Sequence, residues 1–482
     1  MSRRTFTLGA AAVGAAAAMA SPAQAARKAG KSATTRPLDA IVLGAGVSGL
    51  NAAWLLEQQG LKVLVLEGRQ RVGGRVHTLF DLPGVPEMGF NSMGDGYGRG
   101  IDAAHRAGVE LIEVGKRYMH GKPQELVLDG KPLTREQWAA APFNPLPDAL
   151  KTSMPWEVTN KLIAMHNPLE DWAAWLDPAN ASLDISLHAF LTQQGLSDAA
   201  IRLVNDVSPY YGINAYDVSA LMLEFNSGFV MTQISAGPNS WAIKGGNERL
   251  PQGMAALLKG EVLLGKEVVS IDSRTDVAEV RCADGSVYQA GRVVCSLPFS
   301  TLRHVAITPG LSGAQARAVA TLPYQPLSMA FLTATEPFWE HDGRAPGMWT
   351  NSALGTVLPQ RFGATADEVT GLLVQARGGL ARLWDRLGTE AALAKIVATF
   401  EELRPAARGK LKAHRLFSWE AEYFNAGDWA YFAPGQIASF VPTMAEPHGR
   451  IHFCGEHTAT GARGLEGALE SSERAALEIL SL

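Results

Sequence analysis

The sequence is poor in cysteine and in charge. Its 482 residues include three cysteines, Cys282, Cys295 and Cys454, and charged residues make up 19% of the chain. Three cysteines at these spacings form neither a disulfide framework nor a metal-ligand cluster, so we expect no metal. Lys and Arg (43 residues) nearly balance Asp and Glu (47 residues). This balance does not suggest nucleic acid or an anionic membrane as a partner.

Long hydrophobic runs are also missing. The N-terminal segment contains Arg3-Arg4, an apolar run over residues 8–20 and an A-x-A cleavage site at residues 23–25. The run is shorter than the roughly 20 residues that span a bilayer. We predict a twin-arginine signal peptide over residues 1–25, with an ordinary secretory signal as the alternative. The expected location is periplasmic or exported, with no membrane anchor after signal removal, and residues 26–37 are expected to be a flexible lead-in.

A glycine-rich pattern follows between residues 39 and 75. Its glycines have the spacing G-x-G-x-x-G and are Gly44, Gly46 and Gly49. They lie between a short apolar strand and a predicted helix that ends at Gly60, and a second strand then leads to Glu67. The glycines allow a pyrophosphate to approach the backbone at the helix N-terminus, and Glu67 can accept hydrogen bonds from ribose hydroxyls. These features alone leave NAD and FAD both open.

Four further segments extend this pattern. Glu67 is followed by the run from Arg69 to Arg75, which ends Gly-Gly-Arg, and the C-terminal quarter contains segments 425–436, 451–460 and 464–468. We predict that a helix begins at residues 464–468 and carries a Glu470/Arg474 pair at i, i+4. Aimed at a flavin, the N-terminal dipole of this helix would stabilise negative charge on the reduced ring.

Together these segments resemble flavin-containing amine oxidases, the family of the monoamine oxidases, over essentially the whole chain after the signal. The resemblance favours FAD. It implies a set of cofactor-binding residues: Gly44, Gly46, Ser48, Gly49, Glu67, Arg69, Gly74, Arg75, Val268, Trp419, Gly455, Glu456 and Leu465.

The resemblance also implies three positions at the substrate face of the flavin. Trp429 takes the place of an aromatic wall, and Gly464 stands where monoamine oxidases have the facing aromatic residue. Met329 lies where the family often has a lysine linked through water to the flavin. We assign these three positions to the substrate site and assign no acid or base. From the sequence alone, the pair Tyr210-Tyr211 is either core or pocket wall.

Two more departures from the family concern the flavin itself. In the loop after Arg75, Glu87 and Gly89 match the family, whereas Phe90 replaces a second glycine. Asp428 stands where enzymes with covalently linked flavin have a cysteine. The resemblance therefore implies FAD held without a covalent bond.

The predicted fold class is α/β, with a Rossmann-like FAD-binding domain of the GR2 flavoprotein type and a discontinuous α+β substrate domain that includes a helical insertion. The FAD-binding domain is expected to comprise residues 38–115, 240–310 and 411–482. The substrate domain is expected to comprise residues 116–239 and 311–410. The amphipathic pattern between residues 156 and 228 predicts the helical insertion.

The predicted function is oxidation of a small-molecule amine by hydride transfer from its α carbon to flavin N5, followed by hydrolysis of the imine. Dioxygen or a cytochrome or quinone is the expected electron acceptor. L-amino acid oxidation is one alternative, but it requires an arginine for the carboxylate, and the loop after Glu87 offers Phe90, Asn91 and Ser92 instead. A desaturase or porphyrinogen-oxidase-like enzyme and a non-catalytic flavin-binding protein also stay open.

Overall fold

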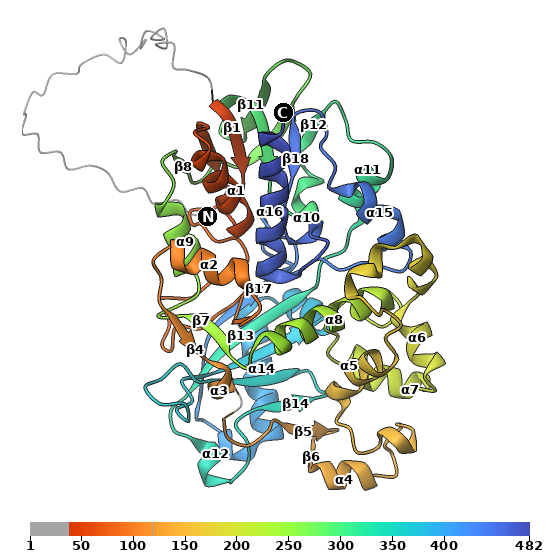
Figure 1. The fold of residues 1–482 in the computed structure, drawn as a ribbon. Coiled ribbons are helices and arrows are strands. Elements are labelled where there is room, and N and C mark those ends of the chain that lie inside the picture. The colour runs from red at the N-terminus through yellow and green to blue at the C-terminus, as the bar shows by residue number, and fades with distance from the viewer. Residues whose placement is uncertain (1–37, 119) are drawn as a thin grey trace, which may run out of the picture. The chain divides into compact units, whose positions relative to one another are not determined.

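The computed structural model describes residues 38–118 and 120–482, so the predicted signal peptide and lead-in lie outside the described residues. Across these ranges, no helix combines the length and the apolar character needed to cross a membrane. The described chain contains one mostly parallel sheet, one mostly antiparallel sheet and a small three-stranded sheet, with helices around them (Figure 1).

The eight-stranded sheet contains the strands on either side of the glycine motif. Its strands are β1 (Leu38–Leu43), β2 (Val63–Leu66), β8 (Val262–Leu263), β9 (Val268–Asp272), β10 (Ala278–Cys282), β11 (Val287–Cys295), β12 (Ala306–Thr308) and β18 (Ile451–Phe453). The order is β12-β9-β10-β11-β1-β2-β8, and β18 also pairs with β11. β1 lies between two parallel neighbours, β2 and β11. Residues 40–43 of β1 are fully buried, as expected for a parallel strand that is covered on both faces.

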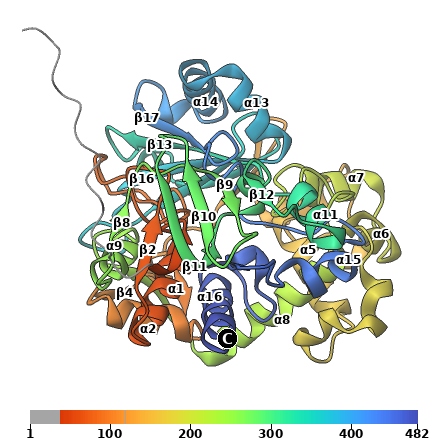
Figure 2. The same cartoon turned by 90° about the horizontal axis from the view of Figure 1, so that it is seen from above.

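Two helices from opposite ends of the chain pack side by side against this sheet. They are α1 (Val47–Gln58) and α16 (Gly464–Leu480), and Figure 2 shows them together below the strands. Asn51 on α1 donates a 2.9 Å hydrogen bond from Nδ2 to Oγ of Ser472 on α16. The first and last parts of the chain therefore form one unit around the cofactor motif.

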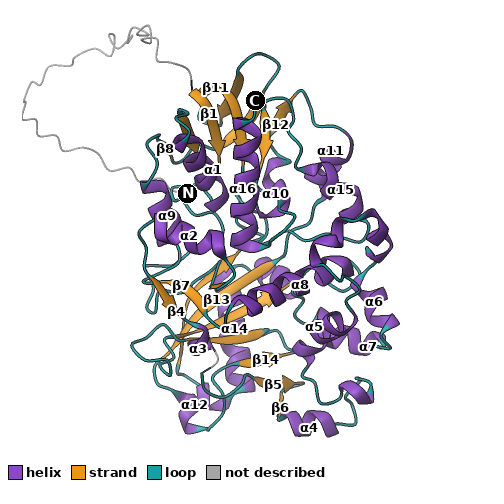
Figure 3. Cartoon of the chain, viewed as in Figure 1, coloured by secondary structure: helices purple, strands orange, loops and turns teal. Residues whose placement is uncertain are grey.

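The seven-stranded sheet forms the second part of the fold (Figure 3). Its strands are β5 (Glu125–Leu128), β6 (Lys131–Leu133), β13 (Leu327–Ala334), β14 (Met348–Thr350), β15 (Thr356–Gln360), β16 (Gly371–Arg377) and β17 (Leu411–Ser418). α13 (Gly379–Leu387) and α14 (Thr389–Leu403) contribute Trp384, Ile396 and Phe400 to a buried cluster shared with β13 and β16. This burial joins the two helices to the sheet.

The remaining elements connect these parts. The three-stranded sheet consists of β3 (Met93–Gly94), β4 (Leu111–Glu113) and β7 (Ser240–Ile243). The helical insertion consists of α5 (Pro155–His166), α6 (Leu187–Gln193), α7 (Asp198–Ile201) and α8 (Ala220–Ala236), with short turns of other helix types between them. The other helices are α2 (Gly98–Arg106), α3 (Gly115–Tyr118), α4 (Arg135–Ala140), α9 (Arg249–Ala256), α10 (Phe299–Leu302), α11 (Gly313–Thr321), α12 (Phe338–His341) and α15 (Gln436–Met444).

The predicted fold class is confirmed, including the helical insertion, but one strand differs from the predicted division of the chain. β17 pairs with β13 in the seven-stranded sheet, whereas the sequence pattern groups residues 411–482 with the FAD-binding part. Pairing between distant strands decides sheet membership, and a short strand pattern does not reveal its partner. The division into residue ranges otherwise stays a prediction.

Candidate active site

A cavity of about 500 Å³ runs from the glycine motif to Trp429. Eleven of the predicted cofactor-binding residues line it. From the first part of the chain these are Gly44, Gly46, Ser48, Glu67, Arg69, Gly74 and Arg75, and from later parts Val268, Gly455, Glu456 and Leu465. The structure therefore brings together residues that lie more than 400 positions apart in the chain.

Glycine is required at two positions of the motif. Gly44 has φ +95°, which favours glycine, and a Cβ there would lie 2.7 Å from Ser296 Oγ. A Cβ on Gly49 would lie 2.1 Å from the carbonyl oxygen of Gly44. Gly49 does not line the cavity; it allows the first turn of α1 to approach β1. Gly46, by contrast, has nothing within 4 Å of its Cβ position, so it borders open space.

Glu67 is held in one orientation at the end of β2. Its carboxylate accepts hydrogen bonds from the backbone N–H of Ala45 (2.8 Å) and of Arg69 (2.9 Å). The side chain is buried, yet the residue lines the cavity. Each carboxylate oxygen has further acceptor capacity. Glu67 therefore has acceptor capacity at the cavity, and its contact with ribose hydroxyls stays a prediction.

Arg75 crosslinks the wall of the cavity near Trp429. Its Nη1 donates to the backbone oxygen of Asp428 at 2.7 Å and to Glu456 Oε1 at 2.8 Å. Glu456 Oε1 also accepts from the backbone N–H of Ala430 at 2.8 Å. Burial opposes ionisation of Glu456, but Arg75 and Arg463 outweigh it and hold the pKa of this carboxyl below its ordinary value. The network joins three distant segments at the cavity wall.

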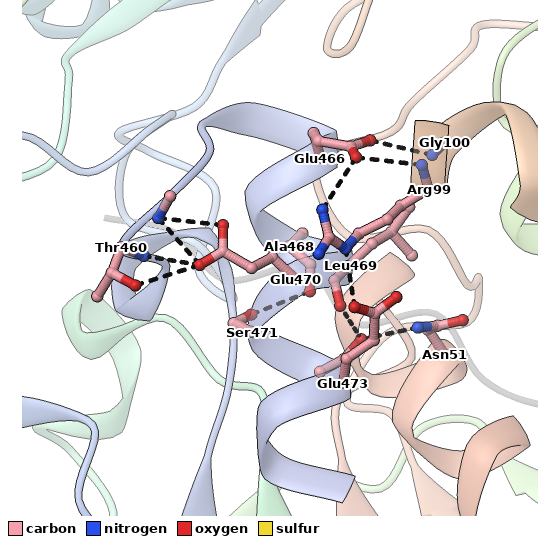
Figure 4. A network of polar contacts seen from close by, with 12 residues as sticks. Asn51, Arg99, Gly100, Thr460, Glu466, Ala468, Leu469, Glu470, Ser471 and Glu473 are labelled. Carbon is pink, nitrogen blue, oxygen red and sulfur yellow. Dashed lines mark hydrogen bonds and ion pairs between the residues drawn. The ribbon is translucent and has the colours of Figure 1, made fainter. Parts of the chain in front are cut away.

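The N-terminus of α16 is fixed at the cavity by acidic side chains, several of which Figure 4 shows. Glu466 accepts from the backbone N–H groups of Arg99 and Gly100, each at 3.1 Å. Glu470 accepts from those of Thr460 and Gly461, each at 3.0 Å. Gly464, Leu465 and Ala468 of this helix line the cavity. A helix N-terminus there favours an anion.

The predicted pair between Glu470 and Arg474 is wrong. Glu470 instead binds the N–H groups of the preceding loop, and Arg474 donates to Glu478 at 2.6 Å. Two backbone N–H groups donate to the Glu470 carboxylate, and these charge-assisted hydrogen bonds outweigh the small gain from a surface ion pair.

The loop after Arg75 reaches the cavity at Gly89, Phe90, Asn91 and Ser92. A Cβ on Gly89 would lie 1.9 Å from the carbonyl oxygen of Arg75, so this matched glycine is required. Glu87 does not line the cavity. It accepts from Thr78 Oγ1 and from the backbone N–H of Asn247, each at 2.7 Å, and burial raises its pKa to about 8. Glu87 holds the loop in place.

Trp419 supports this loop from behind. It is fully buried, and its Nε1 donates to the backbone oxygen of Met88 at 2.6 Å. Trp419 was predicted to bind the cofactor, but it does not line the cavity. The structure places it one layer away, where its indole fixes the Met88–Gly89 segment.

Trp429 lines the cavity, and its stacking partner comes from the helical insertion. The rings of Trp429 and Tyr210 are 4.9 Å apart with an interplanar angle of 24°. Tyr210 also lines the cavity, whereas Tyr211 is buried behind it and meets Trp429 edge on at 6.1 Å. Gly464 borders open space, since nothing lies within 4 Å of a Cβ built there. The second aromatic ring of the wall therefore comes from Tyr210.

Met329 differs from the prediction that placed it at the substrate face. It does not line the cavity but lies on β13 in a buried cluster with Leu79, Phe331 and Trp419. Alternation along a strand decides which face a side chain meets, and Met329 faces this cluster. Asp428 does line the cavity. It is buried, and burial raises its pKa to about 7 despite Arg75 and Arg377.

Two residues near the aromatic wall were not predicted from the sequence. Tyr97 lines the cavity from the turn before α2, and no local motif marks it. Arg377, at the end of β16, lies with its guanidinium carbon 4.9 Å from the ring centroid of Tyr210. Only the pairing of strands and loops brings these residues to the site.

The residues present fit FAD. The glycine cradle excludes a Cβ at Gly44 and Gly49, Glu67 presents a fixed carboxylate, and two helix N-termini border one continuous cavity. Such an arrangement matches a dinucleotide with a ring system at its far end.

Comparison with known proteins shows the family. The model of the "Flavin containing amine oxidoreductase" family matches residues 47–480. The chain belongs to this family, so it is a flavin-dependent oxidoreductase that acts on amines, and its cofactor is FAD.

The chain is similar to relatives of more than one kind. It is 27% identical to human "Amine oxidase [flavin-containing] B", over 92% of this chain and 86% of that protein. It is 26% identical to "Putative L-amino-acid oxidase YobN" of Bacillus subtilis, over 93% and 96%. Among solved structures, cyclohexylamine oxidase from Brevibacterium oxydans has a TM-score of 0.73 at 22% identity, with 92% of this chain and 99% of that chain covered. This last likeness shows the fold.

Proposed function

We propose that the protein oxidises the carbon–nitrogen bond of a small amine that binds between Trp429, Tyr210 and the loop at residues 89–92. The observation that carries this proposal is the single cavity that joins the glycine cradle to that aromatic wall. FAD held there would supply the redox chemistry by accepting a hydride from the amine's α carbon. The released imine is hydrolysed to a carbonyl compound and ammonia or an amine.

The protein's own residues position the substrate and exclude water. The rings of Trp429 and Tyr210 present apolar surface to the substrate, and Arg75 with Glu456 keeps the wall in place. The N-terminus of α16 stabilises negative charge that develops at its end of the cavity. No acid or base is assigned, because a desolvating pocket favours the neutral amine that hydride transfer requires.

We further propose that FAD is held without a covalent bond. Asp428 rather than a cysteine precedes Trp429, and Cys282, Cys295 and Cys454 are buried and do not line the cavity. Acid precipitation tests this proposal. FAD that is not covalently bound would leave the precipitated protein, so the yellow colour would pass to the supernatant.

The electron acceptor is proposed to be dioxygen or a cytochrome or quinone. Ser328 and Met329 stand where the family often has a lysine, and Ser328 donates a hydrogen bond to Asp385 at 2.9 Å. Peroxide formation in air supports dioxygen, whereas turnover only with an added quinone or cytochrome supports the second class.

An anaerobic amine panel tests the proposed function. The purified yellow protein is mixed without oxygen with monoamines, diamines, polyamines and amino acids, and the flavin absorbance is followed. Bleaching by at least one class supports the proposal. No bleaching across all classes would overturn it and favour a non-catalytic flavin-binding role.

The substitution Trp429→Ala tests the aromatic wall. Removing the indole leaves the glycine cradle intact, so FAD content should stay within about 20% of wild type while kcat/KM falls about 10- to 100-fold. Flavin absorbance per protein and steady-state kinetics measure the two quantities. Equal loss of FAD and of turnover would contradict a role at the substrate face.

We also propose export through the twin-arginine pathway, on the basis of Arg3-Arg4, the short apolar run and the A-x-A site. This pathway carries folded proteins, which suits an enzyme that must acquire its cofactor before export. The location is then the periplasm or the exterior.

A further inference from the structure

Arg377 is a cation beside the rings of Tyr210 and Trp429, and the proposed function gives it no role. It ends β16, and its guanidinium carbon lies 4.9 Å from the ring centroid of Tyr210 and 5.6 Å from that of Trp429. Both rings line the cavity. Among the described residues, Arg377 makes no side-chain hydrogen bond and no ion pair, so its five donors are available.

The fold places Arg377 at the wall by a close backbone contact. The next residue, Gly378, has φ +56°, and a Cβ there would lie 2.8 Å from Pro209 and 3.2 Å from the backbone of Ile213. This contact seats the loop that carries Tyr210 directly on the end of β16. Gln325 Nε2 donates to the backbone oxygen of Gly212 at 3.2 Å and holds the same loop. These contacts therefore fix the position of Arg377 next to the loop that carries Tyr210.

Arg377 is not sealed from solvent. Arg377 is partly exposed, and Tyr210 beside it has 51% of its surface accessible. Arg377 does not itself line the cavity, so an anion would meet it at the rim formed by Tyr210 and Trp429. That rim adjoins the place where the amine is proposed to bind.

The charges around the rim favour an anionic group. Arg75 is paired with Glu456 at 2.8 Å, while Arg463 lies 3.8 Å from the same carboxylate. Asp428, which lines the same cavity, has its pKa raised to about 7 by burial. Burial also lowers the pKa of Arg377, although Tyr210 and Asp428 act in the opposite direction. An unpaired, desolvated cation is costly, and a bound anion relieves that cost.

We propose that Arg377 binds a carboxylate of the substrate, so that the preferred amines are amino acids or other amines that carry an anionic group. This inference rests on the proposed amine oxidation and names its substrate class. The loop after Glu87 lacks an arginine, and β16 supplies the guanidinium instead. A planar guanidinium can hold a carboxylate through two parallel hydrogen bonds.

A binding experiment on the FAD-loaded protein tests the proposal without turnover. Benzoate and its neutral analogue benzamide are titrated at pH 6, below the pKa of about 7 of Asp428, and at constant ionic strength, and the flavin absorbance spectrum reports the Kd. Benzoate should bind more tightly to wild type, and Arg377→Met should weaken benzoate about 10- to 100-fold while leaving benzamide unchanged. Arg377→Lys, which keeps the charge, should recover part of the affinity.

The matched control is Arg415→Met. Arg415 lies on β17 in the same sheet and pairs with Asp81 at 2.7 Å on the surface. This variant should bind benzoate as wild type does. Equal benzoate affinity in wild type and Arg377→Met, or equal weakening in Arg415→Met, would overturn the proposal. Flavin content per protein shows that each variant is folded.

Turnover with decarboxylated pairs separates this inference from the proposed function. Anaerobic flavin reduction is compared for L-phenylalanine with 2-phenylethylamine and for L-leucine with isopentylamine. The amino acid of each pair should be preferred by wild type, and Arg377→Met should lose that preference. If the amines reduce the flavin equally well in both proteins, the inference fails and amine oxidation stands. If no member of any pair or of the amine panel reduces it, amine oxidation fails, and benzoate binding alone decides the role of Arg377.

Discussion

Replacing Gly49 by alanine should destabilise the protein, although replacing a glycine inside a helix by alanine usually stabilises it. Gly to Ala inside a helix normally stabilises a protein by about 0.5–1 kcal/mol. In Gly49→Ala the new methyl group would lie 2.1 Å from the Gly44 carbonyl oxygen, 2.7 Å from Ser296 Oγ and 3.1 Å from Val42 Cγ1. Relieving such a clash requires α1 to move away from β1, so the variant should lose at least about 3 kcal/mol, the upper end for overpacked sites.

The assay is thermal melting of the cofactor-free protein together with FAD retention. For 482 residues the unfolding entropy corresponds to about 1 kcal/mol per degree, so Gly49→Ala should melt at least about 3 °C lower. Its flavin content should also fall, because moving α1 displaces the phosphate cradle. Gly98→Ala is the control, since Gly98 is the first residue of α2 and nothing lies within 4 Å of its Cβ position.

A second control distinguishes the two nearest clashes. Adding Ser296→Ala to Gly49→Ala removes the Oγ contact at 2.7 Å but leaves the backbone oxygen at 2.1 Å, so it should not restore FAD retention. If Gly49→Ala melts like Gly98→Ala and keeps its flavin, the contact between α1 and the Gly44 backbone does not require glycine at position 49. Full rescue by Ser296→Ala would show that the hydroxyl, rather than the Gly44 backbone, limits the space.

Two further predictions concern charge. The buried carboxyl of Asp428 keeps its proton up to about pH 7 in the folded protein, against an ordinary pKa of 3.8, so folding stability falls as the pH rises between these values. Cofactor-free Asp428→Asn should therefore exceed wild type by up to about 4 kcal/mol, or about 4 °C in Tm, above pH 7 and match it near pH 4; melting curves that coincide at both pH values contradict this. Replacing Arg3 and Arg4 by Lys should keep the protein in the cytoplasm, as measured by cell fractionation, and unchanged export would exclude the twin-arginine pathway.

Local motifs pointed to residues that the structure gathers at one end of the cavity. The spacing of Gly44, Gly46 and Gly49 between a strand and a helix determines the backbone geometry of the cradle, and Glu67 follows at the end of the next strand. This local geometry can be predicted without knowing which distant segments pack together. Val268 and Glu456 were found only through the family resemblance, and both line the cavity.

The residues at the substrate end of the cavity could not be predicted from local motifs, because packing between distant segments brings them together. Whether Met329 faces the cavity depends on how β13 pairs with β16 and β17, and it faces the core. The ring of Trp419 is oriented by the Met88 carbonyl, which belongs to a distant loop. Arg377 reaches Tyr210 only because Gly378 lets another loop approach its backbone. None of these contacts leaves a periodic or motif signal in the sequence.

The central claim, that the cavity holds FAD and uses it to oxidise an amine, is tested most directly by one anaerobic turnover with product analysis. The FAD-loaded protein is mixed with a limiting amount of the amine or amino acid that bleaches it fastest. We predict that one carbonyl compound and one ammonia or amine form for each flavin reduced. Flavin reduction without carbonyl and ammonia or amine would instead identify a desaturase-like reaction and contradict the account.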